Sequence, residues 1–357
     1  MDLPSPAASS PPADARVVVL GTGGTIAGLA ARPDEHLVYR AARQGVDVLL
    51  AALPELEGLA LEHEQVAQVD SKDMGAAIWQ PLLARCAAHL ARPEVSGLVL
   101  THGTDTLEES AWLLHRVLAP RKPLLLTAAM RPASARGADG PGHLLDALRL
   151  AADPAAPPGV AVVFGGELMA PRGLRKQHPQ RLLAFAPGPR GRLGDLYGGR
   201  LRHPVPLLGP PPADELALGL DAACLPPAPW PRVEVLASHA DADGELVDAL
   251  CAHRPAGGRP LAGLIVAGTG NGTLHQGLAA ALARARAQGC VVWRTTRLPE
   301  GEVIDPEAAD AGCEPLADLA RPVAPDAPLP CIALSPWQAR VELVLRLLAQ
   351  QAARRPG

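Results

Sequence analysis

The chain has 357 residues, of which 48% are hydrophobic and 20% charged, so it can bury a large core and is not intrinsically disordered. Its formal net charge of −4 offers no basic surface to neutralise phosphates, which argues against nucleic acid as a partner. No apolar run reaches the roughly 18 residues that a membrane-spanning helix needs. The 6 cysteines form no CxxC pair, which indicates free thiols in a reducing compartment. We therefore expect a cytoplasmic protein that binds neither nucleic acid nor membranes.

Two proline-rich stretches predict how the chain is divided. Residues 1–15 lack the basic and apolar segments of a secretory signal, so we interpret them as a disordered leader. Residues 204–232 are dense in proline and are predicted to link two domains, a larger one at 16–203 and a smaller one at 233–357.

Short β-branched runs alternate with helical patterns in both predicted domains. In the first we expect strands at 16–20, 97–100, 123–127 and 159–164, and helices at 46–53 and 106–118. In the second we expect strands at 233–238, 263–268 and 290–295, helices near 243–253 and 273–288, and a last helix after residue 335. This alternation predicts an α/β fold in which each domain is a mainly parallel sheet flanked by helices.

Two of these helices carry local signals at their starts. Thr106 and Glu109 have the spacing of a capping box. Ser335 is expected to cap the last helix, with Pro336 in its first position. Five apolar residues of that helix are predicted to share one face: Trp337, Val341, Val344, Leu345 and Leu348.

The loop after the first strand, GTGGTIAG at 21–28, is rich in glycine. It fails the dinucleotide-binding pattern because Ile26 stands where the third glycine is needed, and Leu29 breaks the phosphate-binding lysine pattern. What remains is the hydroxyl of Thr25 on a tight turn, which could present a nucleophile or could simply cap the next segment.

The loop after the 97–100 strand, THGTDTLEES at 101–110, carries a second set of reactive groups. Thr104 offers a hydroxyl and Asp105 a carboxylate, and the helix start that follows favours a negative charge. The same residue types are also good helix caps. In open α/β sheets ligands bind where the strands end, so both loops are candidate sites.

No metal or cofactor motif accompanies these loops. His63 and Glu64 begin like the HExxH zinc motif, but Ala67 occupies the place of the second histidine. We predict neither a metal site nor a cofactor.

The segments TGGTIAG (22–28) and LTHGTDTLEE (100–109) together resemble the two signature segments of the bacterial-type L-asparaginase family. The resemblance extends over roughly 16–350 and includes VDSKDM (69–74), LRK (174–176) and AGTGNGT (267–273). It implies hydrolysis of L-asparagine to L-aspartate and ammonia, and a homo-oligomer, either a dimer or a tetramer, with sites between subunits. Glutamine hydrolysis as a side activity stays open, because one methylene changes specificity by only about 1–3 kcal/mol.

The resemblance also implies catalytic roles. Thr25 matches the nucleophile that forms a β-aspartyl ester, and Tyr39 matches the flap tyrosine that takes its proton. Thr104, Asp105 and Lys176 match a second triad, and which triad attacks first stays open. An ionisable amine is something arginine cannot supply, and the chain has only three lysines, so the presence of Lys176 fits that role.

Substrate contacts follow in the same way. The resemblance implies that Ser71 binds the α-carboxylate and Asp105 the α-ammonium, with Thr104 also among the substrate-binding residues. Asn271 is implied to contribute from a neighbouring subunit. The G-N-G setting of Asn271 also fits a left-handed turn residue. The family's acidic partner for the flap tyrosine is unassigned, with Glu307 nearest in sequence order.

The sequence departs from the family pattern beside these positions. Lys72 stands where many secreted members have glutamine. Two other functions remain as alternatives: an ammonia-generating subunit of a tRNA-dependent amidotransferase, and a non-catalytic amino-acid sensor on the same fold. The acidic charge balance disfavours the first, and the retained threonines disfavour the second.

Overall fold

The computed structural model describes residues 15–189, 191–204, 218–253, 258–301, 303–304 and 327–354. Residues 1–14 of the predicted leader, 205–217 of the predicted linker, and Glu307 lie outside these ranges. The chain divides into two compact units, one formed by Met1–Leu208 with Asp221–Leu225, the other by Gly209–Leu220 with Pro226–Gly357. We call them the N-terminal and C-terminal units.

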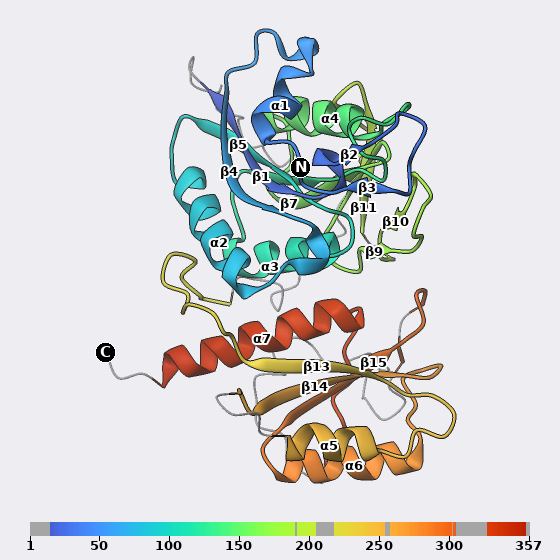
Figure 1. The fold of residues 1–357 in the computed structure, drawn as a ribbon. Helices are drawn as coiled ribbons and strands as arrows, with labels where there is room; N and C mark the ends of the chain where they lie inside the picture. Colours follow the sequence, from blue (N-terminus) through green and yellow to red (C-terminus); the bar gives the residue numbers. More distant parts are fainter. Residues whose placement is uncertain are drawn as a thin grey trace, which may run out of the picture. The chain divides into compact units, whose positions relative to one another are not determined.

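The N-terminal unit is built on one eight-stranded sheet with the strand order β12-β11-β8-β7-β6-β5-β1-β4 (Figure 1). In sheet order these strands are β12 (Arg200–Arg202), β11 (Arg192–Tyr197), β8 (Glu167–Met169), β7 (Gly159–Phe164), β6 (Pro123–Thr127), β5 (Val95–Thr101), β1 (Arg16–Gly23) and β4 (Leu61–Val69). The five strands from β7 to β4 pair in parallel, and β8, β11 and β12 extend the sheet antiparallel.

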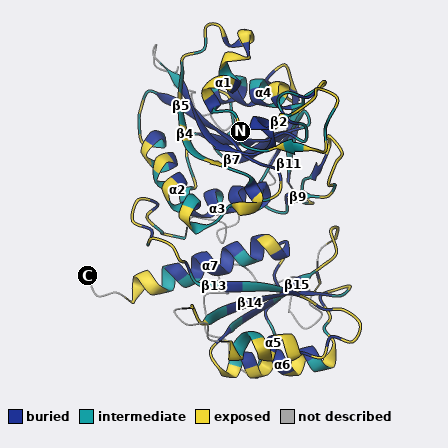
Figure 2. Cartoon of the chain, in the orientation of Figure 1, coloured by how far each residue is buried: buried dark blue, intermediate teal, exposed yellow. Residues whose placement is uncertain are grey.

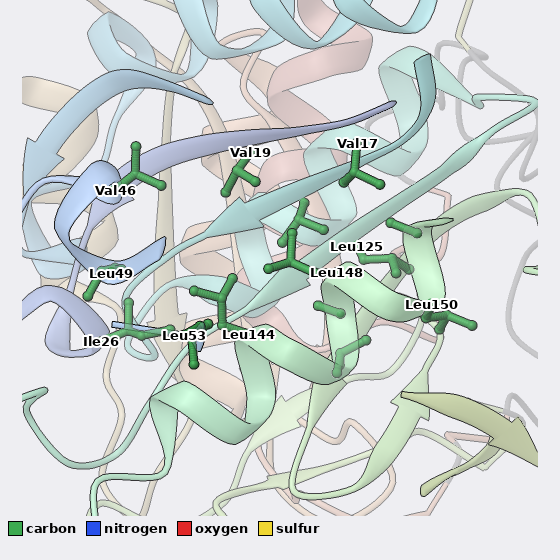
Figure 3. Close-up of a cluster of buried hydrophobic side chains, with 14 of the residues drawn as sticks. Val17, Val19, Ile26, Val46, Leu49, Leu53, Leu125, Leu144, Leu148 and Leu150 are labelled. Atoms are coloured by element: carbon green, nitrogen blue, oxygen red, sulfur yellow. The ribbon is translucent and has the colours of Figure 1, made fainter. Parts of the chain in front are cut away.

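Four helices cover this sheet: α1 (Val46–Ala51), α2 (Ala76–Leu90), α3 (Leu107–Leu118) and α4 (Gly140–Ala152). On one face, Val17 and Val19 of β1 pack in a buried cluster with Leu49 of α1 and with Leu144 and Leu148 of α4 (Figure 3). Side chains alternate along a strand, so the equally buried neighbours of Val17 and Val19 point to the other face, which α2 and α3 cover (Figure 1). The central strands are buried on both sides (Figure 2).

Two short antiparallel ribbons project from this unit. One pairs β2 (Leu29–Ala30) with β3 (Tyr39–Arg40), and the other pairs β9 (Arg175–Lys176) with β10 (Phe185–Ala186). Both ribbons carry residues to which the family resemblance gives a catalytic role.

The C-terminal unit is a three-stranded parallel sheet in the order β13 (Arg232–Ala237), β14 (Leu261–Gly268) and β15 (Val291–Thr296). Helices α5 (Glu245–Ala252) and α6 (Gln276–Ala287) cover one face, and α7 (Pro336–Ala353) covers the other (Figure 1). The exposed sides of α5 and α6 stand out in Figure 2. None of the helices in the described ranges is long and apolar enough to cross a bilayer.

The predicted α/β fold is confirmed, including the strands at 123–127 and 159–164, which the structure reproduces to the residue. The cap of α7 is also confirmed, because the Ser335 hydroxyl accepts from the amide nitrogen of Gln338 at 3.2 Å. Trp337 is 44% exposed, whereas the other four residues of its predicted face are buried.

The capping box predicted for α3 is wrong. Thr106 occupies the N-cap position, but its side chain caps nothing in the helix. Its hydroxyl instead donates to the backbone carbonyl of Ser71 at 2.8 Å. A tertiary contact has therefore taken the group that local spacing assigned to the helix.

Candidate active site

Three loops meet where β4, β1 and β5 end. These neighbouring strands are parallel, so their carboxyl ends lie at the same edge of the sheet. A Cβ added to Gly24 would lie 2.4 Å from the Cα of Gly103, and one added to Gly103 would lie 2.4 Å from Ser71 Oγ. The loops after β1, β5 and β4 are thus in direct contact, and glycine is required where they touch.

The loop after β1 presents Thr25 to a tyrosine. Thr25 begins a short 3₁₀ helix, Thr25–Ala27, and is 8% exposed. Its hydroxyl lies 2.8 Å from the phenolic oxygen of Tyr39 on β3. Gly28 leaves room for the Tyr39 ring, because a Cβ at Gly28 would lie 3.0 Å from it. Thr25 and Tyr39, predicted as a catalytic pair, are within hydrogen-bond distance.

The loop after β5 presents a second group of polar atoms. The ammonium of Lys176 donates to the Thr104 hydroxyl at 2.8 Å and to a carboxylate oxygen of Asp105 at 2.6 Å. The Thr104 residue is buried, and the Asp105 side chain is 53% exposed. The structure therefore brings together all three residues of the predicted second triad, although Lys176 is 71 residues from Asp105.

Ser71 joins the second group from the loop after β4. It begins the 3₁₀ helix Ser71–Asp73 and is buried. Its hydroxyl accepts from the backbone nitrogen of Asp105 at 3.1 Å. Together with the Thr106 bond, this contact fixes the loop after β4 against the start of α3.

Lys72, which follows Ser71, forms ion pairs with two neighbouring aspartates. Its ammonium donates to Asp70 at 2.9 Å and to Asp73 at 3.0 Å. Hydrogen bonds to Asp70 and then Asp73 raise the pKa of Lys72. Its positive charge is thus paired locally in an exposed position.

Asn271 lies in the C-terminal unit, in the turn between β14 and α6. Its side-chain nitrogen donates to the carbonyl of Ile304 at 2.5 Å, and its side-chain oxygen accepts from the nitrogen of Ile304 at 2.7 Å. The left-handed turn conformation belongs to Gly270 and Gly272, with φ of 47° and 75°, and not to Asn271. The side-chain amide of Asn271 therefore makes two hydrogen bonds to the backbone of Ile304 and serves as a clamp on it. The alternative that Asn271 is a left-handed turn residue is wrong.

Two buried polar residues next to the site escaped the sequence reasoning. Glu108, in the first turn of α3, is 5% exposed and accepts from the backbone nitrogen of Lys176 at 3.0 Å. Burial raises the pKa of its carboxyl to about 7. His102, just after β5, is fully buried, and burial lowers its pKa to about 4. The only sequence signal for either was its place beside Thr104.

No group of three or more His, Cys, Asp or Glu side chains suited to a metal ion occurs within the described ranges. The site instead offers two threonine hydroxyls, one beside a phenolic oxygen and one beside an ammonium. A hydroxyl with an adjacent proton acceptor supports nucleophilic acyl transfer. The phenolic oxygen beside Thr25 can accept, whereas the ammonium beside Thr104 donates. An α/β fold with these two hydroxyl pairs at the strand ends is an arrangement that suits a hydrolase.

Comparison with known families places the chain within that class. Residues 16–205 match the family model described as asparaginase, N-terminal, and residues 232–354 match the one described as glutaminase/asparaginase C-terminal domain. The chain belongs to the asparaginase family.

Individual relatives cover most of the chain. It is 33% identical to a glutaminase-asparaginase of Pseudomonas fluorescens, over 80% of this chain and 76% of the relative. It is 30% identical to a probable periplasmic L-asparaginase of Haemophilus influenzae, over 80% of this chain and 78% of the relative. A crystal structure of a probable cytoplasmic L-asparaginase from Campylobacter jejuni is similar, with a TM-score of 0.78 and 32% identity over 93% of this chain and 95% of that one.

Proposed function

We propose that this chain is an L-asparaginase, an amidohydrolase that converts L-asparagine and water to L-aspartate and ammonia. The observation that carries the proposal is the pairing of Thr25 with Tyr39, beside the Thr104–Lys176 pair, in a member of the asparaginase family. The expected activity requires no cofactor.

In the first half of the proposed reaction, the Thr25 oxygen attacks the side-chain amide carbon of asparagine. Tyr39, whose oxygen lies 2.8 Å away, is positioned to receive the threonine proton. The carbon–nitrogen bond then breaks and the nitrogen leaves with that proton as ammonia. The product is a β-aspartyl ester on Thr25.

In the second half, water attacks the ester carbonyl, the ester bond breaks, and aspartate leaves with the Thr25 hydroxyl restored. Thr104 and Lys176 are proposed to activate this water: with the Lys176 amine in its neutral form, the water proton passes through the Thr104 hydroxyl to that amine, whose nitrogen lies 2.8 Å from the threonine oxygen. Asp105 holds the other side of the ammonium at 2.6 Å. The order in which the two threonines act is the part of this scheme that acyl trapping tests.

Substrate binding is proposed to use the groups around Gly103. Ser71 would bind the α-carboxylate, and the half-exposed carboxylate of Asp105 would bind the α-ammonium. Asn271 is proposed to contribute from a neighbouring subunit of a dimer or tetramer. Since its amide is bonded to Ile304, contact with substrate would require it to share or open that clamp.

We further propose a cytoplasmic location, on the widely spaced cysteines and the similarity to the Campylobacter jejuni protein. The Haemophilus influenzae relative carries a periplasmic name, so cell fractionation is the test. Glutamine is proposed as a minor substrate, which the name of the Pseudomonas fluorescens relative supports.

Ammonia release from the purified protein tests the function. L-Asparagine, L-glutamine and D-asparagine are supplied in parallel, with Thr25→Ala as the inactive control. We expect rapid release from L-asparagine and slower release from L-glutamine. Binding of L-asparagine with no ammonia release would favour the amino-acid sensor instead, and release that needs a tRNA-binding partner would favour the amidotransferase subunit.

A further inference from the structure

A chain of three hydrogen bonds lies behind the Thr104 loop. The indole nitrogen of Trp79 on α2 donates to Ser110 Oγ on α3 at 2.9 Å. Ser110 Oγ lies 2.9 Å from Nε2 of His102, and Nδ1 of His102 lies 2.7 Å from the carbonyl oxygen of Gly103. His102 and Ser110 are fully buried and Trp79 is 6% exposed.

Only one set of directions satisfies every member of this chain. An indole N–H can only donate and a carbonyl can only accept, so Ser110 Oγ accepts from Trp79 and His102 Nδ1 carries the hydrogen that Gly103 receives. Burial lowers the pKa of His102 to about 4, so the ring is neutral at neutral pH and its Nε2 is an acceptor. Ser110 must therefore donate to Nε2. The chain fixes both the tautomer and the orientation of the ring.

The chain of hydrogen bonds ends at the peptide bond that precedes Thr104, the second threonine of the site. The carbonyl held by His102 belongs to the peptide bond between Gly103 and Thr104. Gly103 also lies against Gly24 and Ser71, from the other two loops. A rotation of this peptide would move Thr104 away from the Lys176 ammonium and would disturb the contact with the Thr25 loop.

We propose that His102 is a positioning residue whose Nδ1–H holds the Gly103–Thr104 peptide, and that Ser110, by donating to Nε2, keeps His102 in the tautomer that can do so. This inference rests on the proposed function, because it concerns how the same site is kept in its reactive geometry. No partner residue outside the N-terminal unit is needed for it.

Two substitutions of His102 by side chains with the same amide group distinguish a positioning role from a role in packing alone. In His102→Asn the side-chain amide can place an N–H where Nδ1 was, and in His102→Gln the amide reaches only toward the former Nε2 position. We expect His102→Asn to retain most of the wild-type kcat. We expect His102→Gln to lower kcat by about a hundredfold with a much smaller change in KM, the scale of loss that a misplacement of about 1 Å produces.

Trp79→Phe is the matched control, because it removes a donor from the far end of the chain and leaves the Gly103 bond. Its kcat per folded molecule should stay close to wild type even if its melting temperature falls. A nitrogen-15 spectrum of the wild type, with the His102 signal assigned by its absence in His102→Asn, should show Nδ1 protonated at neutral pH.

The outcomes distinguish this inference from the proposed function. A wild-type protein that releases no ammonia from L-asparagine would overturn the function itself. An active wild type with equal kcat in His102→Asn and His102→Gln, each measured per folded molecule, would overturn the positioning role alone. If both variants fail to fold, Ser110→Ala decides: a several-fold loss of kcat per folded molecule supports the role, and unchanged kcat refutes it.

Discussion

The backbone nitrogen of Lys176 donates to the buried carboxyl of Glu108 at 3.0 Å. This bond ties β9, a strand of two residues, to the first turn of α3. The amine of Lys176 reaches Thr104 from that strand, so Glu108 supports the backbone from which the second pair of the site is built.

Glu108 should make the stability of the protein depend on pH. Burial raises its pKa from 4.5 to about 7, so the folded state favours the protonated carboxyl. The stability that protonated Glu108 contributes to the folded state is fully present below pH 4.5 and is lost as the pH rises through about 7. Glu108→Gln keeps an acceptor for Lys176 without the charge, so it should be more stable than wild type at pH 8, by at most about 3 kcal/mol.

Urea unfolding of wild type and Glu108→Gln at pH 4.5 and pH 8 checks this prediction. The free energy of unfolding of Glu108→Gln should exceed that of wild type at pH 8, and the difference should be small at pH 4.5. Glu55→Gln, at an exposed position, is the control and should show no such change. A stability difference for Glu108→Gln that is the same at both pH values would contradict the argument.

Tyr39→Phe should lower kcat with a small effect on KM. The substitution removes the oxygen that lies 2.8 Å from Thr25 and keeps the ring that packs on Gly28. Loss of a general base costs about 10²–10⁴ in rate. Tyr197→Phe is a matched control, because Tyr197 is the other tyrosine of the chain and is 65% exposed. Equal turnover by the two variants would remove Tyr39 from the mechanism.

Lys176→Arg should leave little activity although the positive charge is kept. A guanidinium is larger and does not give up its proton, so it cannot take part in proton transfer with Thr104 at the 2.8 Å that the amine occupies. Lys122→Arg is the control, since Lys122 donates to the backbone carbonyl of Arg92 and is outside the site. Steady-state ammonia release measures both, and substantial turnover by Lys176→Arg would make Lys176 a structural residue.

Gly24→Ala should abolish activity and destabilise the fold. Gly24 has φ of 81°, and its added Cβ would lie 2.4 Å from the backbone of Gly103. Gly58→Ala isolates the cost of a positive φ, because Gly58 has φ of 89° with nothing within 4 Å. That cost is about 1–2 kcal/mol. Thermal unfolding should show a clearly larger loss for Gly24→Ala, and similar losses would mean that the loops do not need their close contact.

The buried parallel strands were predictable because their sequences are continuous β-branched and aliphatic runs. β6 and β7 are such runs, and their bounds were predicted to the residue. β4 was missed because it is an edge strand with charged residues in its sequence LEHEQVAQV. α2 was missed because Pro81 lies inside it, where a proline normally ends a helix.

Site residues were predictable where a reactive side chain lies in the loop directly after a strand. They were less predictable where their role depends on tertiary contacts. Thr25, Thr104 and Asp105 sit in loops that strand patterns alone marked as candidates. Lys176 came from the family resemblance, since a strand of two residues has no readable period. The roles of Glu108 and His102 depend on burial and on partners far along the chain, which no local pattern contains.

The central claim is that Thr25 carries the acyl group during asparagine hydrolysis, and acid-quench peptide mass spectrometry tests it most directly. Wild type and Thr104→Val are mixed with L-asparagine, quenched within one turnover and digested. The account predicts the mass of one aspartyl group on the peptide that contains Thr25, with greater accumulation in Thr104→Val because deacylation is slowed. An aspartyl group on the wild-type peptide that contains Thr104, and none on Thr25, would contradict it.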